Sequence, residues 1–97
     1  MADERREYLQ ATLPQYQSHK KVWAAKILRV IQGPEDMTGL ICEDAAGREM
    51  PEISVTDEWY EDHMVLEGGY LVVYADGYES WSPKEAFEQG NTLLPQD

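Results

Sequence analysis

The chain has 97 residues and a formal net charge of −11, which is enough sequence for one small domain that buries about 60–65% of its unfolded surface. A field of that sign repels phosphate backbones and anionic lipids, so neither direct binding to duplex nucleic acid nor binding to a membrane is expected. The single cysteine, Cys42, excludes an intrachain disulfide. Residues 1–7 are charged and no apolar core follows them, so the sequence predicts a reduced, cytoplasmic setting.

The charge is distributed unevenly along the chain. Residues 1–34 hold six basic and three acidic residues, whereas residues 35–97 hold two basic and sixteen acidic ones. The second part therefore favours basic partners. The alternative is that its carboxylates only keep a small domain soluble.

The first expected element is a short helix over residues 3–13. Asp3 can cap it, Leu9 and Leu13 lie four residues apart, and Pro14 ends it. Its apolar face is thin, and an isolated helix of this length frays in water. We therefore expect residues 1–15 to form an N-terminal helical arm that orders against a partner or a second copy, and residues 16–97 to form a single α+β domain.

The middle of the chain predicts three strands and a short helix. Residues 19–31 fit both a strand and a helical stripe, and a strand is favoured because Val, Trp and Ile are β-formers and Gly33-Pro34 breaks the run. Residues 38–43 and 49–55 read as two strands joined by a Gly-containing loop over residues 44–47. Thr56 or Asp57 then caps a helix that runs to about His63.

The last part of the chain predicts a hairpin that leads into a helix. Asp76-Gly77 tolerates the positive φ angles of a two-residue type I′ turn, which pairs Ala75 with Tyr78. In this register one face carries Leu71 and Val73, and the other carries Tyr70, Val72, Tyr74 and Trp81. A helix follows the hairpin: Ser82 offers its N-cap, Pro83 fits its first position, and Gly90 ends it.

These elements predict the α+β class, with a small, strongly bent antiparallel sheet or partly open barrel of about five strands and two or three short helices. Both faces of the last hairpin are apolar. Either the sheet is covered on both sides, or one face is an interface. We expect a homodimer to cover either the face of Tyr70, Val72, Tyr74 and Trp81 or an edge strand.

Two blocks of sequence resemble a family. The patterns HKxVxAxKI at residues 19–27 and GGYxVVYxDGYxSxSPxxAFExG at residues 68–90 are similar to those of a group of small uncharacterised proteins encoded by tailed phages and prophages. The resemblance covers about residues 16–92, and this chain has Asn91 where the family pattern often has Tyr. The resemblance implies a bacterial host cytoplasm and a shared fold, and it carries over no catalytic residue.

The candidate protein interface combines acids and aromatic rings. The acids Asp57, Glu58, Glu61 and Asp62 stand at helical spacing. They predict a ridge that imitates a nucleic-acid backbone or docks on a basic host protein, and the alternative is a hydrated helix start. Tyr70, Tyr74 and Trp81 are interface candidates because Tyr and Trp dominate binding energy, and the alternative is that they form core.

A nucleotide site is the alternative hypothesis. Its candidate residues are His19, Lys20 and Lys26 for a phosphate and Trp23 for stacking on a base. The competing interpretation is that these cations form weak surface ion pairs. His19, His63 and Cys42 do not match a zinc spacing, and no nucleophile motif appears. No metal, cofactor or enzymatic activity is therefore expected.

The sequence thus predicts a non-enzymatic, acidic binding protein from a phage or prophage that modulates or inhibits a host factor, with counter-defence as one such role. The first alternative is a small-molecule binder that sequesters a nucleotide signal. The second alternative is a minor structural or assembly protein of the virion.

Overall fold

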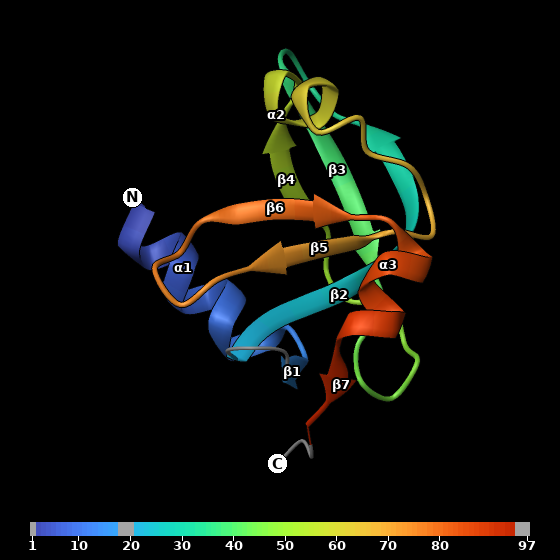
Figure 1. Cartoon of the computed structure of the whole chain (residues 1–97). Coiled ribbons are helices and arrows are strands. Elements are labelled where there is room, and N and C mark those ends of the chain that lie inside the picture. Colours follow the sequence, from blue (N-terminus) through green and yellow to red (C-terminus); the bar gives the residue numbers. More distant parts are fainter. Residues whose placement is uncertain (1, 18–20, 95–97) are drawn as a thin grey trace.

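The computed structural model describes residues 2–17 and 21–94 (Figure 1). Its elements in chain order are α1 (Ala2–Thr12), β1 (Gln15–Gln17), β2 (Lys21–Gln32), β3 (Met37–Cys42), β4 (Ile53–Thr56), α2 (Asp57–Asp62), β5 (Tyr70–Val73), β6 (Glu79–Ser82), α3 (Lys84–Gly90) and β7 (Thr92–Leu93). The predicted α+β class with an open, antiparallel sheet is confirmed. The strands beyond the expected five are β1 and β7, which have three and two residues. No helix in the described part of the chain is long and apolar enough to cross a membrane.

Strand β2 joins two parts of the sheet, and the strand interpretation of this segment is confirmed. Its first half pairs with β1 on one edge and with β5 on the other, while its second half pairs with β3. The register with β3 shifts between Ile27 and Arg29, and such an irregularity bends a strand. As a result β3 and β4 run across the direction of β5 and β6 (Figure 1).

The main core fills the space between these two parts of the sheet. Ala25 and Ile27 from β2 meet Leu40 of β3 and Leu71 and Val73 of β5, all at most 1% exposed. Complete burial of the Ile, Leu and Val side chains of this cluster contributes roughly 1.5–3 kcal/mol each.

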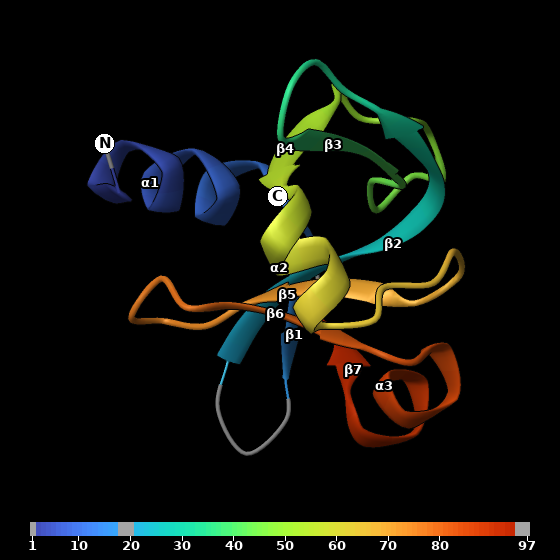
Figure 2. The same cartoon turned by 90° about the horizontal axis from the view of Figure 1, so that it is seen from above.

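A second, smaller core lies on the other face of β2 and β5, under α3 (Figure 2). Phe87 of α3 stacks on Tyr70 with ring centroids 4.2 Å apart, and Val22, Ala24 and Val72 complete the cluster. Tyr70 and Val72 are only 6% and 4% exposed. The chain itself therefore covers both faces of β5, and these two residues have almost no surface left for the predicted homodimer.

Helix α1 packs against the domain. Leu9 and Leu13 are 1% and 4% exposed and belong to the main core. The guanidinium of Arg5 also holds the carboxylate of Glu79 on β6. The apolar face of the segment expected as an arm is thus covered by the chain's own core.

The turn of the β5–β6 hairpin differs from the predicted type I′ turn. Gly77 donates to the carbonyl of Tyr74 (2.9 Å), and Tyr74 donates to the carbonyl of Tyr78 (3.0 Å). Only Gly77 has a positive φ, +92°, whereas Asp76 does not. The loop therefore has three residues, with a type I turn followed by a left-handed glycine. The extra residue shifts the register of the two strands by one residue, and Trp81 therefore pairs with Leu71.

This change of register moves Trp81 to the other face of the sheet. Side chains alternate along a strand, so a slip of one residue exchanges the faces. Trp81 packs against the main core, on the opposite face from Tyr70 and Val72. Its indole lies over Gly69, where a Cβ atom would collide with the ring. The predicted common face of Tyr70 and Trp81 is wrong.

Among the predicted ends of helices α2 and α3, only the start of α2 is confirmed. The Thr56 hydroxyl accepts from the backbone N–H of Trp59 (3.1 Å), which confirms the cap of α2. In α3 the N-cap is Pro83, one residue later than predicted, and Ser82 makes no capping bond. The end of α3 also differs, because the Asn91 side chain rather than a left-handed Gly90 bonds a terminal carbonyl, that of Phe87 (2.9 Å).

We predict that Gly77→Val destabilises the protein by about 1–2 kcal/mol or more in urea unfolding. A β-branched residue resists the positive φ, and a Cβ at this position would also meet the Arg6 side chain at 2.7 Å. Gly90→Ala is the control, because nothing lies within 4 Å of that Cβ and its φ is not positive. Equal midpoints for Gly77→Val and wild type would contradict the turn.

We also predict that Leu9→Ala costs about 2–5 kcal/mol, because it leaves a cavity in the main core. Tyr8→Ala is the matched control on the same helix, since Tyr8 is 46% exposed. The measurement is chemical unfolding followed by tryptophan fluorescence. If both variants unfold like wild type, α1 contributes nothing to the core and behaves as a separate arm.

Candidate functional site

The acids of α2 lie at the surface, and they differ in how firmly they are held. The Asp57 carboxylate accepts a hydrogen bond from the Thr38 hydroxyl (2.6 Å), which ties the start of α2 to β3. Glu58, Glu61 and Asp62 are exposed. Within the described residues they have no side-chain hydrogen bond or ion pair. Their charges are therefore available to a partner.

The chain that follows α2 exposes apolar side chains beside these acids. Met64 is 77% exposed and Leu66 is 67% exposed. Met64 also has a φ of +51°, a region that residues other than glycine rarely adopt. This φ ends helix α2, because the N–H of Met64 bonds the carbonyl of Glu61 (3.1 Å) and the N–H of Val65 bonds that of Tyr60 (3.3 Å), as in a Schellman motif. We call residues Asp57–Glu67 the acidic segment.

The acidic segment borders a groove between α2 and β2. Its volume is about 460 Å³, and its lining consists of Val30, Gln32, Thr38, Asp57, Tyr60 and Glu61. Tyr60 and Val30 supply the apolar surface of the groove, and both also pack against the main core. The groove thus combines an apolar floor with the Asp57 and Glu61 carboxylates.

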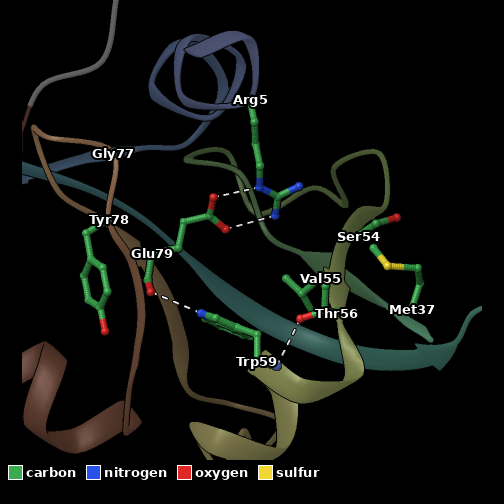
Figure 3. Close-up of a pocket in the computed structure, with 9 residues that line it drawn as sticks. All are labelled: Arg5, Met37, Ser54, Val55, Thr56, Trp59, Gly77, Tyr78 and Glu79. Carbon is green, nitrogen blue, oxygen red and sulfur yellow. Dashed lines mark hydrogen bonds and ion pairs between the residues drawn. The ribbon is translucent and has the colours of Figure 1, made fainter. Parts of the chain in front are cut away.

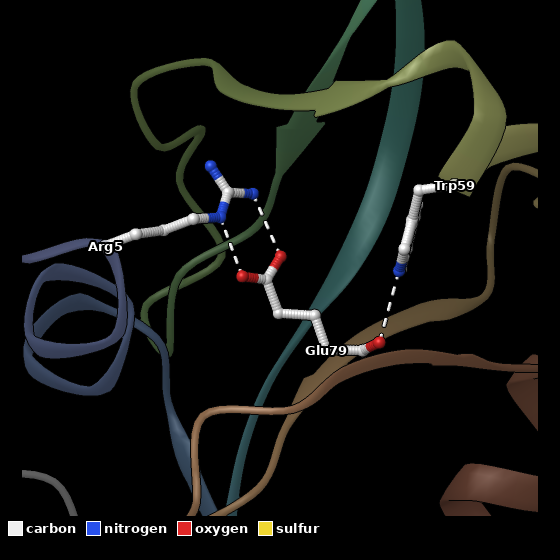
Figure 4. A network of polar contacts seen from close by, with 3 residues as sticks. All are labelled: Arg5, Trp59 and Glu79. Atoms are coloured by element: carbon white, nitrogen blue, oxygen red, sulfur yellow. Dashed lines mark hydrogen bonds and ion pairs between the residues drawn. The ribbon is translucent and has the colours of Figure 1, made fainter. Parts of the chain in front are cut away.

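A second cavity, of about 470 Å³, lies where α1, α2, β4 and β6 meet (Figure 3). Arg5 donates through Nε and Nη2 to the Glu79 carboxylate at 2.7 and 2.9 Å. The Trp59 indole donates to the Glu79 carbonyl at 3.1 Å (Figure 4). The charges in this cavity are already paired with each other, so its polar groups hold α1, α2 and β6 together.

The structure separates two of the nucleotide candidates. Trp23 packs against the main core, whereas Lys26 lies on the other side of the sheet, in a cavity of about 370 Å³ that Tyr16 and Tyr70 also line. The same cavity contains Glu43 and Asp44, whose carboxylates oppose a phosphate. His19 and Lys20 lie outside the described residues. Nucleotide binding stays a prediction.

The three aromatic interface candidates do not form one surface. Tyr70 is buried under α3, and its hydroxyl donates to Glu88 at 2.7 Å. Burial, together with this hydrogen bond, raises the pKa of Tyr70. Tyr74 stacks near Tyr78 at 6.1 Å between ring centroids, and Trp81 packs on the opposite face of the hairpin.

The groups considered for catalysis or metal binding are dispersed. Burial raises the pKa of the Cys42 thiol to about 12, so it is protonated at neutral pH. The His63 ring stacks on Trp59 and bonds its carbonyl (2.9 Å). Among residues 2–17 and 21–94, no three His, Cys, Asp or Glu side chains are grouped as a metal site would need.

We predict that Cys42 does not react with a thiol reagent at pH 8 in the folded protein and reacts once urea unfolds it. Because the folded pKa lies above the ordinary value of 9.0, the unfolded state loses its proton first, and stability falls as the pH rises from about 9 towards 12. In Cys42→Ala this decline should be smaller. Rapid labelling of the native protein would contradict the burial of the thiol.

Comparison with family models, with curated proteins and with solved structures finds no match to this chain. The resemblance to tailed-phage proteins therefore stays a prediction, and the candidate site depends on its own geometry.

Proposed function

We propose that this chain is a non-enzymatic binding protein that docks on a basic protein through the acidic segment. The observation that carries the proposal is the combination found there: exposed carboxylates that no cation of the described chain pairs with, next to the exposed side chains of Met64 and Leu66. Carboxylates steer and orient a basic partner. Apolar side chains supply contact area that water would otherwise cover.

The distribution of charge around the acidic segment supports the same conclusion. From residue 49 to residue 83 the chain has nine acidic residues and no lysine or arginine. Such a stretch repels itself and gains from a cationic partner. If the negative charge served solubility alone, exposed Met64 and Leu66 would work against it.

The proposed setting follows the resemblance stated for residues 16–92. A phage or prophage product in a bacterial cytoplasm meets host proteins, and an acidic surface suits the basic surfaces of host factors that act on nucleic acids. The proposed action is to occupy such a surface and so modulate or inhibit the host factor. The virion and nucleotide alternatives stay predictions.

The test is a charge reversal within the acidic segment. We expect Glu58→Lys/Glu61→Lys to weaken binding of the captured partner about tenfold, mainly by slowing association. The tagged protein is used to capture partners from bacterial lysate, mass spectrometry identifies them, and surface plasmon resonance then measures the rates in dilute and physiological salt.

The matched control is Glu7→Lys/Glu85→Lys, which changes the net charge equally at exposed acids of α1 and α3. Equal losses in both double variants would mean that only the total charge matters. A partner that is acidic at its contact surface, or binding that does not respond to salt, would refute the proposal.

A further inference from the structure

Strand β2 has one edge that is only partly used. One edge pairs with β3 from Ile27 to Gln32. The other edge pairs with β5 from Trp23 to Lys26, and Ile27 then bonds the backbone of Gly68 and Gly69 at 2.8 Å each. From Leu28 to Gln32, no strand of the described chain lies on that second edge. We call Leu28–Gln32 the open edge.

The hydrogen-bond pattern shows which groups the open edge presents. In an antiparallel pair, alternate residues direct both backbone groups at the partner strand and the residues between them direct both groups away. The bond from the Gly33 N–H to the Met37 carbonyl (3.0 Å) sets this alternation. Arg29 and Ile31 therefore bond β3, while Val30 and Gln32 direct their N–H and C=O groups to the open edge.

A carboxylate occupies part of this edge. The N–H of Val30 donates to the Glu67 carboxylate at 3.2 Å. Among the backbone groups that Val30 and Gln32 direct to the open edge, this is the one hydrogen bond within the described residues. The acceptor stands where the carbonyl of a neighbouring strand would stand, and its long, exposed bond can exchange with another acceptor.

The surroundings of the open edge define what would fit there. On the inner side the groove between α2 and β2 presents Tyr60 with Asp57 and Glu61. On the outer side Ile31 is 39% exposed, and Leu66 comes just before Glu67 in the chain. Exposed edges are commonly protected by lysine, proline or a covering loop. Here carboxylates surround the edge, and its own cation, Arg29, already pairs with Glu49. The remaining carboxylates repel acidic strands and attract basic ones.

We infer that the open edge accepts an extended basic segment of the partner as an additional strand. Its backbone would bond Val30 and Gln32, in the mode by which peptides extend a sheet. Alternate side chains would be Lys or Arg facing Asp57 and Glu61, and the others would be apolar and face Ile31. Glu67 would leave the N–H of Val30 and pair with a cation. This inference depends on the proposed function and specifies the form of its partner.

The probe is a fluorescein-labelled nine-residue peptide in which Lys and Val alternate, and binding to the full chain is measured by fluorescence anisotropy. Two further peptides have the same sequence and charge but carry backbone N-methyl groups, either on every Lys or on every Val. In an added strand all N–H groups of one of these two sets face β2. One methylated peptide should therefore lose about tenfold or more in affinity, and the other should bind nearly as the parent does.

Hydrogen exchange locates the contact. We expect the parent peptide to slow exchange of the Gln32 amide, while the Ile31 amide, already bonded to β3, should change little. Gln32→Pro removes the N–H at the open edge and should weaken the parent peptide. If this variant does not fold, the methylated peptides and the exchange data still decide the question.

Two outcomes would overturn the inference. If both methylated peptides bind as tightly as the parent, the charges act without strand pairing, and the acidic docking of the proposed function stands without the open edge. The second outcome is a dimer of the free protein at high micromolar concentration that Gln32→Pro converts to monomer, because the edge would then belong to a second copy. If the charge reversal leaves binding of the captured partner unchanged while only one methylated peptide loses affinity, the open edge stands and the docking of the proposed function is wrong.

Discussion

The fold depends on the bend in β2. A flat strand of twelve residues could join one sheet only, and its two ends would lie far apart. With the register shift between Ile27 and Arg29, the first half carries β1 and β5 and the second half carries β3. The side chains of Ala25 and Ile27 therefore point into a space that strands enclose on two sides. Helices α1 and α2 close this space, and they can be short because the bend has already brought the strands together.

The same bend explains why the candidate site lies where it does. Past Ile27 the strand turns away from β5, so β5 cannot follow it and the open edge begins there. Helix α2 and the chain after it approach this edge through side chains, Tyr60 packing into the core and Glu67 bonding Val30. The pairing that stabilises the domain thus leaves an unused length of strand beside the most acidic part of the chain.

The elements that could be predicted from the sequence are those with local signals. The cap at Thr56, the strand before Gly33-Pro34 and the hairpin around Gly77 each depend on a few neighbouring residues. The register predicted for that hairpin is wrong, because Asp76-Gly77 fits turns of two and of three residues, and the choice between them decides the face of Trp81. The acids of α2 were identifiable by helical spacing, since all of them are near one another in the chain.

What escaped prediction depends on contacts between distant residues. Arg5 and Glu79 are 74 positions apart, and nothing near either residue indicates the other. The thin apolar face of α1 looks insufficient until Leu9 and Leu13 are placed over a core built from later strands. Trp23 and Lys26 are close in sequence yet lie on opposite sides of the sheet, because an interval of three residues in a strand reverses the face.

The contact of Trp81 with Gly69 has a consequence for how this chain can diverge. The indole occupies the space that any side chain at position 69 would need, and its buried N–H has no hydrogen-bond partner within the described residues. The two positions therefore share one fixed volume. A side chain at position 69 needs a smaller residue at position 81, and either change alone costs stability, the first through a collision and the second through a cavity. We expect the two positions to covary, and an intermediate with only one of the changes to be selected against.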